Sequence, residues 1–292
     1  MRVFVTGATG FIGSAVVQEL RAAGHQVLGL ARSDEAEARL AQAGAEAHRG
    51  ELEDLHSLAA GARACDGVIH LAFIHDFSRY EENAETDRQA LAAMADAMEG
   101  SGKPLVATSG TAVLPPGRIG TEGDPPTAQT RAKSELVLAA AQRGVGVSVV
   151  RLPPSVHGQG DRAFVPGLID IARRTGVSAY VGEGQNRWPA VHRLDAARLF
   201  RLALERAAPG QRLHGVAEEG IPVRAIAETI GEGLGVPVRS VAADEAPAQF
   251  GWLAGFVALD APASSAITRE AMDWDPREPD LLTDLRENGY FA

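Results

Sequence analysis

Runs of apolar residues alternate with helical patterns through the first half of the chain. The apolar runs have the length of buried strands, and they cover residues 2–6, 26–31, 67–73, 104–110 and 147–152, with a further strand ending before Gly50. Apolar positions recur with helical spacing over residues 11–24, 35–44, 79–98 and 127–143. Strands that are separated by crossover helices predict an α/β fold with a doubly wound parallel sheet and helices on both faces.

The pattern becomes less regular after Pro153. The segment PPSVHGQGD is rich in proline and glycine, and amphipathic helices are predicted beyond it at 192–205 and 223–235. We therefore expect a first domain in residues 1–152 and a smaller α/β substrate lobe in residues 153–292, partly interwoven with the first.

Composition and charge exclude several classes of protein. The 292 residues carry a net charge of −10 without a basic run, which argues against nucleic-acid binding. The single Cys65 allows no disulfide within the chain, as is typical of a reducing compartment. The start MRVFVTG lacks a signal-peptide pattern, and no window of about 18 apolar residues predicts a membrane span. We expect a cytoplasmic protein that binds no membrane.

A glycine-rich segment, VFVTGATGFIGSAV, lies between the first predicted strand and the first predicted helix. Gly7 allows a tight turn, Gly10 lets the backbone approach a pyrophosphate, and Gly13 lets the helix pack close to the strand. The helix N-terminus adds free N–H groups and a positive dipole end. The residues expected to bind a dinucleotide in this Rossmann-like domain are Gly7, Thr9, Gly10, Phe11, Ile12 and Gly13.

The end of the second predicted strand indicates which dinucleotide is bound. A carboxylate there would hold a ribose 2′-hydroxyl, but the segment LARSDE places Arg32 and Ser33 first. A cation and a hydroxyl suit a 2′-phosphate, so NADP(H) is favoured over NAD(H), although Asp34 is near enough to leave NAD open. Glu51 and Leu52, after the third strand, are expected to contact the adenine.

Five segments in chain order resemble motifs of the short-chain dehydrogenase/reductase superfamily, in its extended or atypical, epimerase/dehydratase-like form. They are TGATGFIG (TGxxGxxG), VIHLAF (VxHLAA), RLPPSVHGQGD (RxxxVYGPGD), WPAVHRLDAARLFRLAL (FVHVDDVAxAxxxAL) and AMDWDP (LGWxP). The resemblance implies an NAD(P)-binding domain, a C-terminal substrate lobe and a cleft between them. Through the second and third motifs it also implies cofactor contacts by Leu71, Ala72, Pro153 and Ser155.

The resemblance ends at the catalytic pair. Typical members carry Tyr-x-x-x-Lys on the helix after the fifth strand, and the stretch AQTRAKSELVL contains no tyrosine. If Lys133 is the family lysine, Gln129 stands at the tyrosine position. If Glu135 sets the register, Arg131 replaces the lysine and Thr127 the tyrosine. Neither Gln nor Thr titrates near neutral pH, but either cation can anchor the ribose and polarise a substrate oxygen.

Other side chains are therefore considered for the proton and for the substrate oxygen. His75 follows the fourth strand, and His157 takes the tyrosine position of the VYGPGD motif, so each is a candidate for proton transfer. Ser109 and Thr111, after the fifth strand, are equal candidates to contact a carbonyl oxygen. The histidines and Cys65 lack the spacing of metal ligands, so no metal is expected.

Three functions are compatible with this combination. The first is an NADP-dependent oxidoreductase that transfers hydride to a small carbonyl or an activated C=C or C=N bond, with Arg131 or Lys133 as the electrostatic element. The others are an isomerase, epimerase or dehydratase with bound cofactor, and an NADP-sensing protein without catalysis. The resemblance also implies a homodimer that forms through helices 79–98 and 127–143, and a monomer is the alternative.

Overall fold

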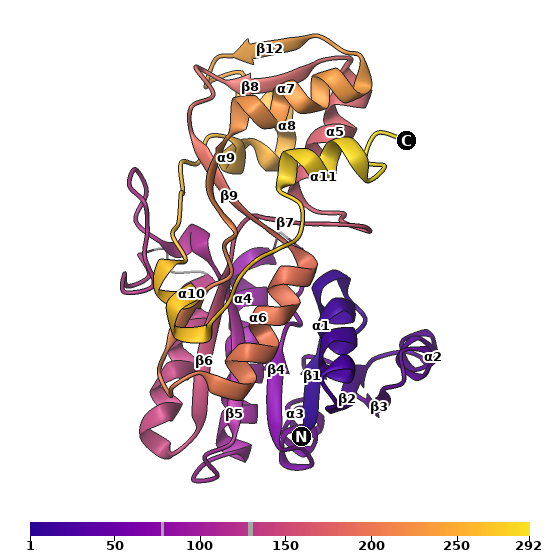
Figure 1. Ribbon diagram of the computed structural model, residues 1–292, viewed down its shortest axis with the longest axis vertical. Coiled ribbons are helices and arrows are strands. Elements are labelled where there is room, and N and C mark those ends of the chain that lie inside the picture. The colour runs from indigo at the N-terminus through magenta and orange to yellow at the C-terminus, as the bar shows by residue number, and fades with distance from the viewer. Residues whose placement is uncertain (77–78, 128–130) are drawn as a thin grey trace.

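The computed structural model describes residues 1–76, 79–127 and 131–292, except for the side chains of Arg131 and Ala132. Seven strands form one sheet in the order β10-β6-β5-β4-β1-β2-β3, and every pairing in it is parallel (Figure 1). The strands are β1 (Arg2–Thr6), β2 (Gln26–Ala31), β3 (Glu46–Arg49), β4 (Gly67–His70), β5 (Pro104–Gly110), β6 (Gly146–Leu152) and β10 (Arg212–His214). The predicted α/β class with a doubly wound parallel sheet is confirmed.

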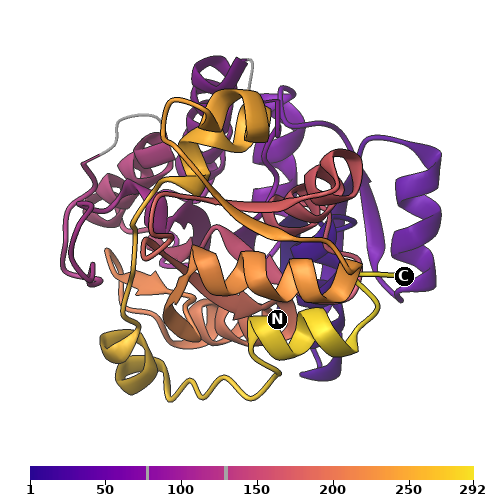
Figure 2. The same cartoon turned by 90° about the horizontal axis from the view of Figure 1, so that it is seen from above.

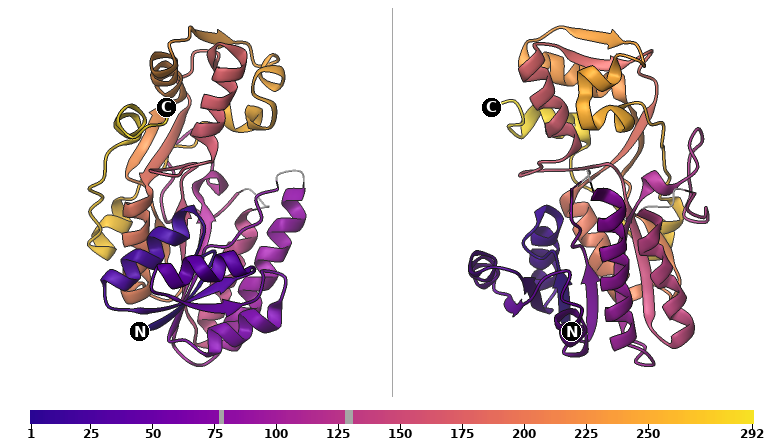
Figure 3. Two further views of the ribbon diagram at one scale, coloured as in Figure 1. Left: turned by 90° about the vertical axis from the view of Figure 1, so that its right-hand side faces the viewer. Right: turned by 180° about the vertical axis from the view of Figure 1, so that it is seen from behind.

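Helices cover both faces of this sheet (Figure 3). One face carries α1 (Phe11–Ala22), α2 (Asp34–Gln42) and α6 (Arg193–Arg206), and the other carries α3 (Leu55–Arg63), α4 (Tyr80–Ala97) and η3 (Arg131–Arg143). Each face has its own buried apolar cluster, with Phe200 in the first and Leu91 in the second. Because both faces are covered, the central strands read as continuous apolar runs in the sequence.

The order of the strands reverses between β1 and β4. Ligands of open α/β sheets bind outside the carboxyl ends of the strands at such a reversal. The glycine loop follows β1, and residues 71–76 follow β4, so the fold brings these two segments together at this edge.

A second lobe is built on smaller sheets (Figure 1). Strands β7 (Ser155–His157), β9 (Arg187–His192) and β11 (Glu218–Pro222) form one sheet, and β8 (Ser178–Val181) pairs with β12 (Val238–Val241). The helices are α5 (Phe164–Thr175), α7 (Val223–Leu234), α8 (Ala246–Phe250), η4 (Gly251–Leu253), α9 (Ala254–Val257) and α11 (Leu281–Glu287). Helices α7 and α11 lie side by side over the lobe (Figure 2).

The chain crosses between the lobes more than once. After β9 it returns to the first sheet as α6 and β10, and after the second lobe it returns again as α10 (Ala266–Met272), which packs on α6. Residues beyond 152 therefore contribute to both lobes, and a division at that residue separates α6 and β10 from the sheet that they complete.

Several elements differ from the sequence-based expectation. The helix expected at 127–143 is described from Arg131 onward as a 3₁₀ helix, and the strand expected at 67–73 ends at His70. Helix α3, which the pattern did not predict, begins where Asp54 accepts a hydrogen bond from the backbone N–H of Ser57 at 3.0 Å. In the described part of the chain, no helix is long and apolar enough to span a membrane.

Candidate functional site

The glycine loop is packed too tightly for any other residue at two of its positions. Gly7 has φ +66°, and a Cβ there would lie 2.8 Å from the backbone nitrogen of Ala72. A Cβ on Gly13 would lie 2.0 Å from the carbonyl oxygen of Gly7. Gly10 precedes α1 without a side-chain cap, so the first N–H groups of this helix remain available to a ligand. This cradle fits the pyrophosphate of a dinucleotide.

A cleft of about 1410 Å³ runs from this loop across the carboxyl ends of the strands to the second lobe. It brings together most of the residues that the sequence predicts for the site. Those that line it are Gly7, Thr9, Gly10, Phe11, Ile12, Gly13, Arg32, Ser33, Glu51, Leu52, Leu71, Ala72, His75, Ser109 and Pro153.

The end of the cleft beyond β2 holds two arginines. Arg32 is exposed there, and Arg39 on α2 lines the same region while its guanidinium donates to the carbonyl of Thr9 at 2.7 Å. Asp34, which left NAD open, is instead paired with Arg49 at 2.8 Å. The sequence analysis did not single out Arg39, because it lies seven residues after Arg32 and reaches the cleft only through the winding of helix α2.

Ser109 and Thr111 have different surroundings. Both hydroxyls are buried and find no hydrogen-bond partner among the described residues, but only Ser109 lines the cleft. The neighbouring Thr108 hydroxyl donates to the carbonyl of His70 at 2.7 Å. A buried hydroxyl without a partner that faces a cleft is suited to contact a ligand oxygen, so the structure favours Ser109 over Thr111 for that contact.

The stretch without a tyrosine does not bring Lys133 to the cleft. Gln129 and the side chain of Arg131 lie outside the described residues, and the Thr127 hydroxyl donates to the carbonyl of Val113 at 3.1 Å. Lys133 forms an ion pair with Glu81 on α4 and is absent from the residues that line the cleft. The ribose contact expected of Lys133 would therefore require its side chain to leave this ion pair.

Glu135 serves the structure rather than the chemistry. Its carboxylate accepts hydrogen bonds from the buried Arg151 guanidinium at 2.7 and 2.8 Å and from Arg212 at 2.8 Å. Burial alone would raise the pKa of Glu135, but these hydrogen bonds outweigh burial and hold its pKa below the usual range. Glu135 thus joins η3 to β6 and β10.

A buried chain of hydrogen bonds runs from the glycine loop to η3. Thr6 Oγ1 accepts from the two backbone N–H groups that follow His70, both at 3.2 Å, so its own proton points to His70 Nδ1 at 2.8 Å. His70 is then the Nε2–H tautomer and donates to Asp87 Oδ1 at 3.1 Å, while Ser134 donates to Asp87 Oδ2 at 2.7 Å. The chain fixes η3 relative to the nucleotide loop.

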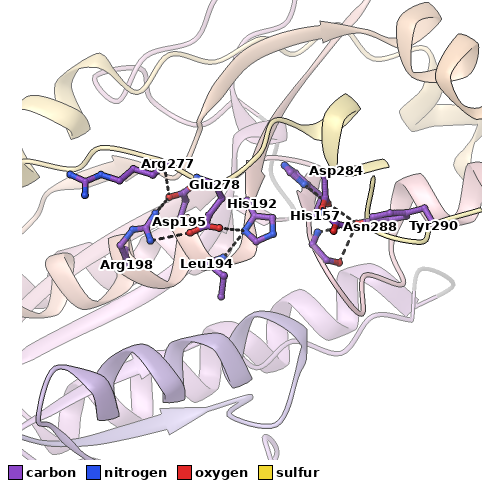
Figure 4. A network of polar contacts seen from close by, with 11 residues as sticks. His157, His192, Leu194, Asp195, Arg198, Arg277, Glu278, Asp284, Asn288 and Tyr290 are labelled. Carbon is purple, nitrogen blue, oxygen red and sulfur yellow. Dashed lines mark hydrogen bonds and ion pairs between the residues drawn. The ribbon is translucent and has the colours of Figure 1, made fainter. Parts of the chain in front are cut away.

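His157 is held in the base of the second lobe (Figure 4). Its side chain is buried, its Nδ1 lies 2.8 Å from Asp284 Oδ2, and it does not line the cleft. Ser155, on the same strand, is also buried and outside the cleft lining. The loop after His157 is clamped because the Tyr290 hydroxyl accepts from the N–H of Gly158 at 2.9 Å and donates to its carbonyl at 3.1 Å.

Asp161 is a titratable side chain in the cleft that the sequence analysis missed. It lines both the large cleft and a smaller pocket of about 340 Å³ between the Gly158 loop and Tyr290. Burial raises the pKa of Asp161 to about 6. The final D of the GQGD segment marked this position, but its burial depends on the packing of the C-terminal residues against the loop. A carboxyl group with this pKa can exchange a proton near neutral pH.

Three comparisons place these features among known proteins. The chain belongs to the NAD dependent epimerase/dehydratase family, whose model matches residues 3–214. This membership confirms the resemblance to the short-chain dehydrogenase/reductase superfamily and supports a pyridine nucleotide cofactor. The family is one of NAD(P)-binding enzymes.

Individual relatives cover most or all of the chain. An uncharacterized protein of Schizosaccharomyces pombe is 49% identical over 296 residues, with 100% of both chains covered. A 4-hydroxy-2-methyl-3-oxo-4-farnesyl-3,4-dihydroquinoline-1-oxide ketoreductase of Stigmatella aurantiaca is 33% identical, with 76% of this chain and 70% of that one covered. The solved dTDP-glucose 4,6-dehydratase of Streptomyces venezuelae, with NAD and TYD bound, shares the fold at a TM-score of 0.79 and 22% identity, with 98% of this chain and 96% of that one covered.

Proposed function

We propose that the protein is an NADP(H)-dependent oxidoreductase that reduces a carbonyl or an activated C=C or C=N bond. The observation that carries this proposal is the cleft itself. It joins the glycine cradle to the hydroxyl of Ser109, which has no hydrogen-bond partner among the described residues, and to two titratable side chains, His75 and Asp161. The ketoreductase relative, which shares 33% identity, supports the same class of reaction.

The nicotinamide supplies a hydride when the cofactor is bound. Ser109 donates a hydrogen bond to the substrate oxygen, which stabilises the negative charge that develops there. A cation of the stretch without a tyrosine, Arg131 or Lys133, holds the ribose and strengthens this electrostatic effect. Because Lys133 is engaged with Glu81, Arg131 is the first residue to test.

The proton comes from the outer half of the cleft, which is the part lined by Phe73, His75, Tyr80 and the residues of the second lobe. His75 is exposed and lines it, and its ring contacts Phe73 with centroids 5.3 Å apart. Asp161 lines it from the opposite lobe. Either group replaces the absent tyrosine as general acid, which is a role that commonly contributes about 10²–10⁴ in rate. His157, which is buried against Asp284, is not placed for this role.

The preference for NADP(H) rests on the charge around the end of β2. Arg32 and Arg39 offer two guanidinium groups to a 2′-phosphate, and Ser33 adds a hydroxyl that already accepts from the backbone of Ala36 at 3.2 Å. Glu35 also lines this end, and its carboxylate would accept a hydrogen bond from a 2′-hydroxyl more readily than it would tolerate a phosphate. Glu51 and Glu53 line the cleft nearby, so the preference rests on the direct reach of the two guanidinium groups rather than on the net charge of this end.

A second candidate function follows from the family. Epimerases and dehydratases of this family return the hydride to the substrate, so they show no net consumption of the nucleotide. A sensing protein would bind NADP(H) without turnover. The amount of NADPH oxidised per product formed separates these alternatives, because only the reductase consumes one equivalent.

The first experiment is a titration with NADPH and with NADH, followed by energy transfer from tryptophan to the nicotinamide. Tight NADPH binding with weak NADH binding supports the proposal and is followed by a screen of carbonyls, enones and imines. The variants Arg131→Ala and Lys133→Ala, singly and together, then test the cation. Undiminished turnover in the double variant would show that neither Arg131 nor Lys133 takes part in the mechanism.

Assembly and location stay predictions. Helices α4 and η3 pack against one another on the same face of the sheet, and we propose that they form a homodimer contact. A sedimentation experiment that gives a monomer of 30.6 kDa at micromolar concentration would exclude that contact. The cytoplasmic location is proposed from the single, buried Cys65.

A further inference from the structure

The part of the cleft that the second lobe covers has an aromatic wall. The ring centroids of Phe164 and Phe256 lie 4.8 Å apart, those of Phe164 and Trp252 lie 5.8 Å apart, and those of Trp252 and Phe256 lie 6.5 Å apart. All three residues line the cleft, from the start of α5, from η4 and from α9. Three different elements therefore converge to present one aromatic surface.

The first lobe contributes aromatic rings of its own to the lining of this cleft. Phe73 and Tyr80 contact one another with centroids 5.8 Å apart, and both line the same cleft. They come from the loop after β4 and from the start of α4. The cleft thus has aromatic side chains on both of its sides, and a flat ring system can stack against either.

Trp252 is unusual among the tryptophans of the chain. The residue is 52% exposed, whereas Trp188 and Trp274 are 0% and 2% exposed. The Trp252 ring also packs on α5, where a Cβ added to Gly167 would lie 3.6 Å from its Cζ2. A large apolar ring that is fixed in place and left in contact with water gains free energy when an apolar ligand covers it.

The charges around the aromatic wall indicate an uncharged ligand. Among the described residues that the second lobe contributes to the lining, the charged side chains are Asp161 and Arg162, and the first lobe adds His75 beside Phe73. A nucleoside diphosphate carries at least two negative charges and is usually held by several cations. The remaining lining near the wall is apolar, with Pro154, Val156 and Leu259.

We infer that the outer half of the cleft binds an uncharged substrate with a flat, apolar ring system, which stacks on Trp252 and Phe256 with its reducible bond toward Ser109. The inference rests on the proposed function for the reaction, but the binding site can be tested without any turnover. It distinguishes this chain from a nucleotide-sugar enzyme, because such a substrate would place its diphosphate against an aromatic wall.

A binding experiment on the NADP-loaded protein tests the site directly. Trp252 is the exposed tryptophan, so quenching by acrylamide reports mainly on it. The probes are 2-acetonaphthone, as a flat uncharged ketone, and UDP-glucose. We expect 2-acetonaphthone to remove the acrylamide-quenchable part of the fluorescence saturably at micromolar concentration, because it both covers and quenches Trp252, and UDP-glucose to have no effect below millimolar concentration. Tighter binding of UDP-glucose than of the ketone would overturn the inference.

Variants distinguish specific binding at the aromatic wall from non-specific binding to other apolar surfaces. Trp252→Ala, measured by calorimetry with 2-acetonaphthone, should weaken binding about tenfold, which corresponds to about 1.4 kcal/mol. Trp252→Phe, which keeps a ring, should weaken it less than threefold. Ile267→Ala is the matched control, because Ile267 is 50% exposed on α10 and does not line the cleft. Equal affinity of Trp252→Ala and the unaltered protein would contradict the inference.

The two proposals fail in different ways. If 2-acetonaphthone binds through Trp252 but NADPH is not oxidised with any carbonyl, the aromatic binding site is supported and the reductase function is contradicted. If small aliphatic aldehydes are reduced with NADPH and Trp252→Ala leaves the kcat/KM of flat ketones unchanged, the reductase function stands and the aromatic site falls.

Discussion

His157 Nδ1 lies 2.8 Å from Oδ2 of Asp284, a residue 127 positions later in the chain, and both side chains are buried. The contact joins the end of β7 to helix α11, near the C-terminal end of the described chain. Asp284 also accepts a hydrogen bond from the side chain of Asn288 (Figure 4). Burial alone would raise the pKa of Asp284, but the hydrogen bonds from His157 and Asn288 outweigh it and lower its pKa. The pair thus fixes the end of β7, from which the loop with Asp161 begins.

Asp284→Asn should destabilise the protein by about 1–3 kcal/mol, because a buried charge-assisted hydrogen bond is lost. The folded-state pKa of Asp284 is lowered, so its contribution is present above the unfolded value of 3.8 and is lost as the pH falls through the folded value. Urea denaturation at pH 7 and at pH 3 measures both effects. The stability difference between the variant and the unaltered protein should shrink at the lower pH, and an unchanged difference would refute the assignment.

Asp161→Asn should lower kcat by about 10²-fold or more if Asp161 is the general acid. With a pKa of about 6, Asp161 is protonated below that pH, so kcat should be flat at lower pH and fall above it. His75→Gln is the comparison. If it removes activity and Asp161→Asn does not, His75 is the donor.

The same Asp161→Asn variant, although it lowers kcat, should raise the stability of the folded protein. Because the folded-state pKa is raised from 3.8 to about 6, Asp161 favours the folded state most below the unfolded value, and this contribution is lost as the pH rises through 6. The variant should therefore have a higher Tm than the unaltered protein at pH 7.5, measured by calorimetry. Loss of activity together with loss of Tm would indicate a structural role instead.

Glu135→Gln should cost about 3–5 kcal/mol of stability, since it leaves the buried Arg151 guanidinium without its anion. The control lies two residues earlier on the same helix. Lys133→Ala removes an ion pair whose Glu81 partner is 68% exposed, and exposed pairs contribute about 1 kcal/mol or less. Chemical denaturation of both variants checks the contrast, and similar losses for the two would contradict it.

Arg39→Ala and Arg32→Ala should each raise the Kd for NADPH about tenfold and change the Kd for NADH less than twofold, because hydrogen bonds to charged groups contribute about 1.5–3 kcal/mol. Arg49→Ala is the matched control, since Arg49 is engaged with Asp34 and Glu37 and does not line the cleft. Parallel weakening of NADPH and NADH would mean that neither arginine contacts the 2′-phosphate.

The sheet and the glycine loop could be predicted because their signals are local. One short segment holds strand β1, the glycine loop and helix α1. The structure shows why Gly7 and Gly13 must be glycine, because a Cβ at either position would collide with nearby backbone. Helix α5 also has a local signal that was overlooked. Val165, Leu168, Ile169 and Ala172 form a buried helical stripe, but the preceding prolines and glycines made the whole region read as irregular.

The outer half of the cleft could not be predicted from local pattern. Phe164 and Trp252 are 88 positions apart, and their rings meet only because α5 and η4 pack together. The GQGD segment marks the position of Asp161 but not its raised pKa, which depends on burial that the fold creates. The role of Glu135 was missed for the same reason, because Arg212 reaches it from the far edge of the sheet.

The return of α6 and β10 to the first sheet has a consequence for how the chain can be divided. A fragment that stops at residue 152 would leave the α1 face without Phe200, Leu199 and Ala196, which complete its buried cluster. That fragment would expose an apolar face and a free sheet edge at β6, both of which promote aggregation. We therefore expect the N-terminal half, expressed alone, to aggregate rather than to behave as an independent nucleotide-binding module.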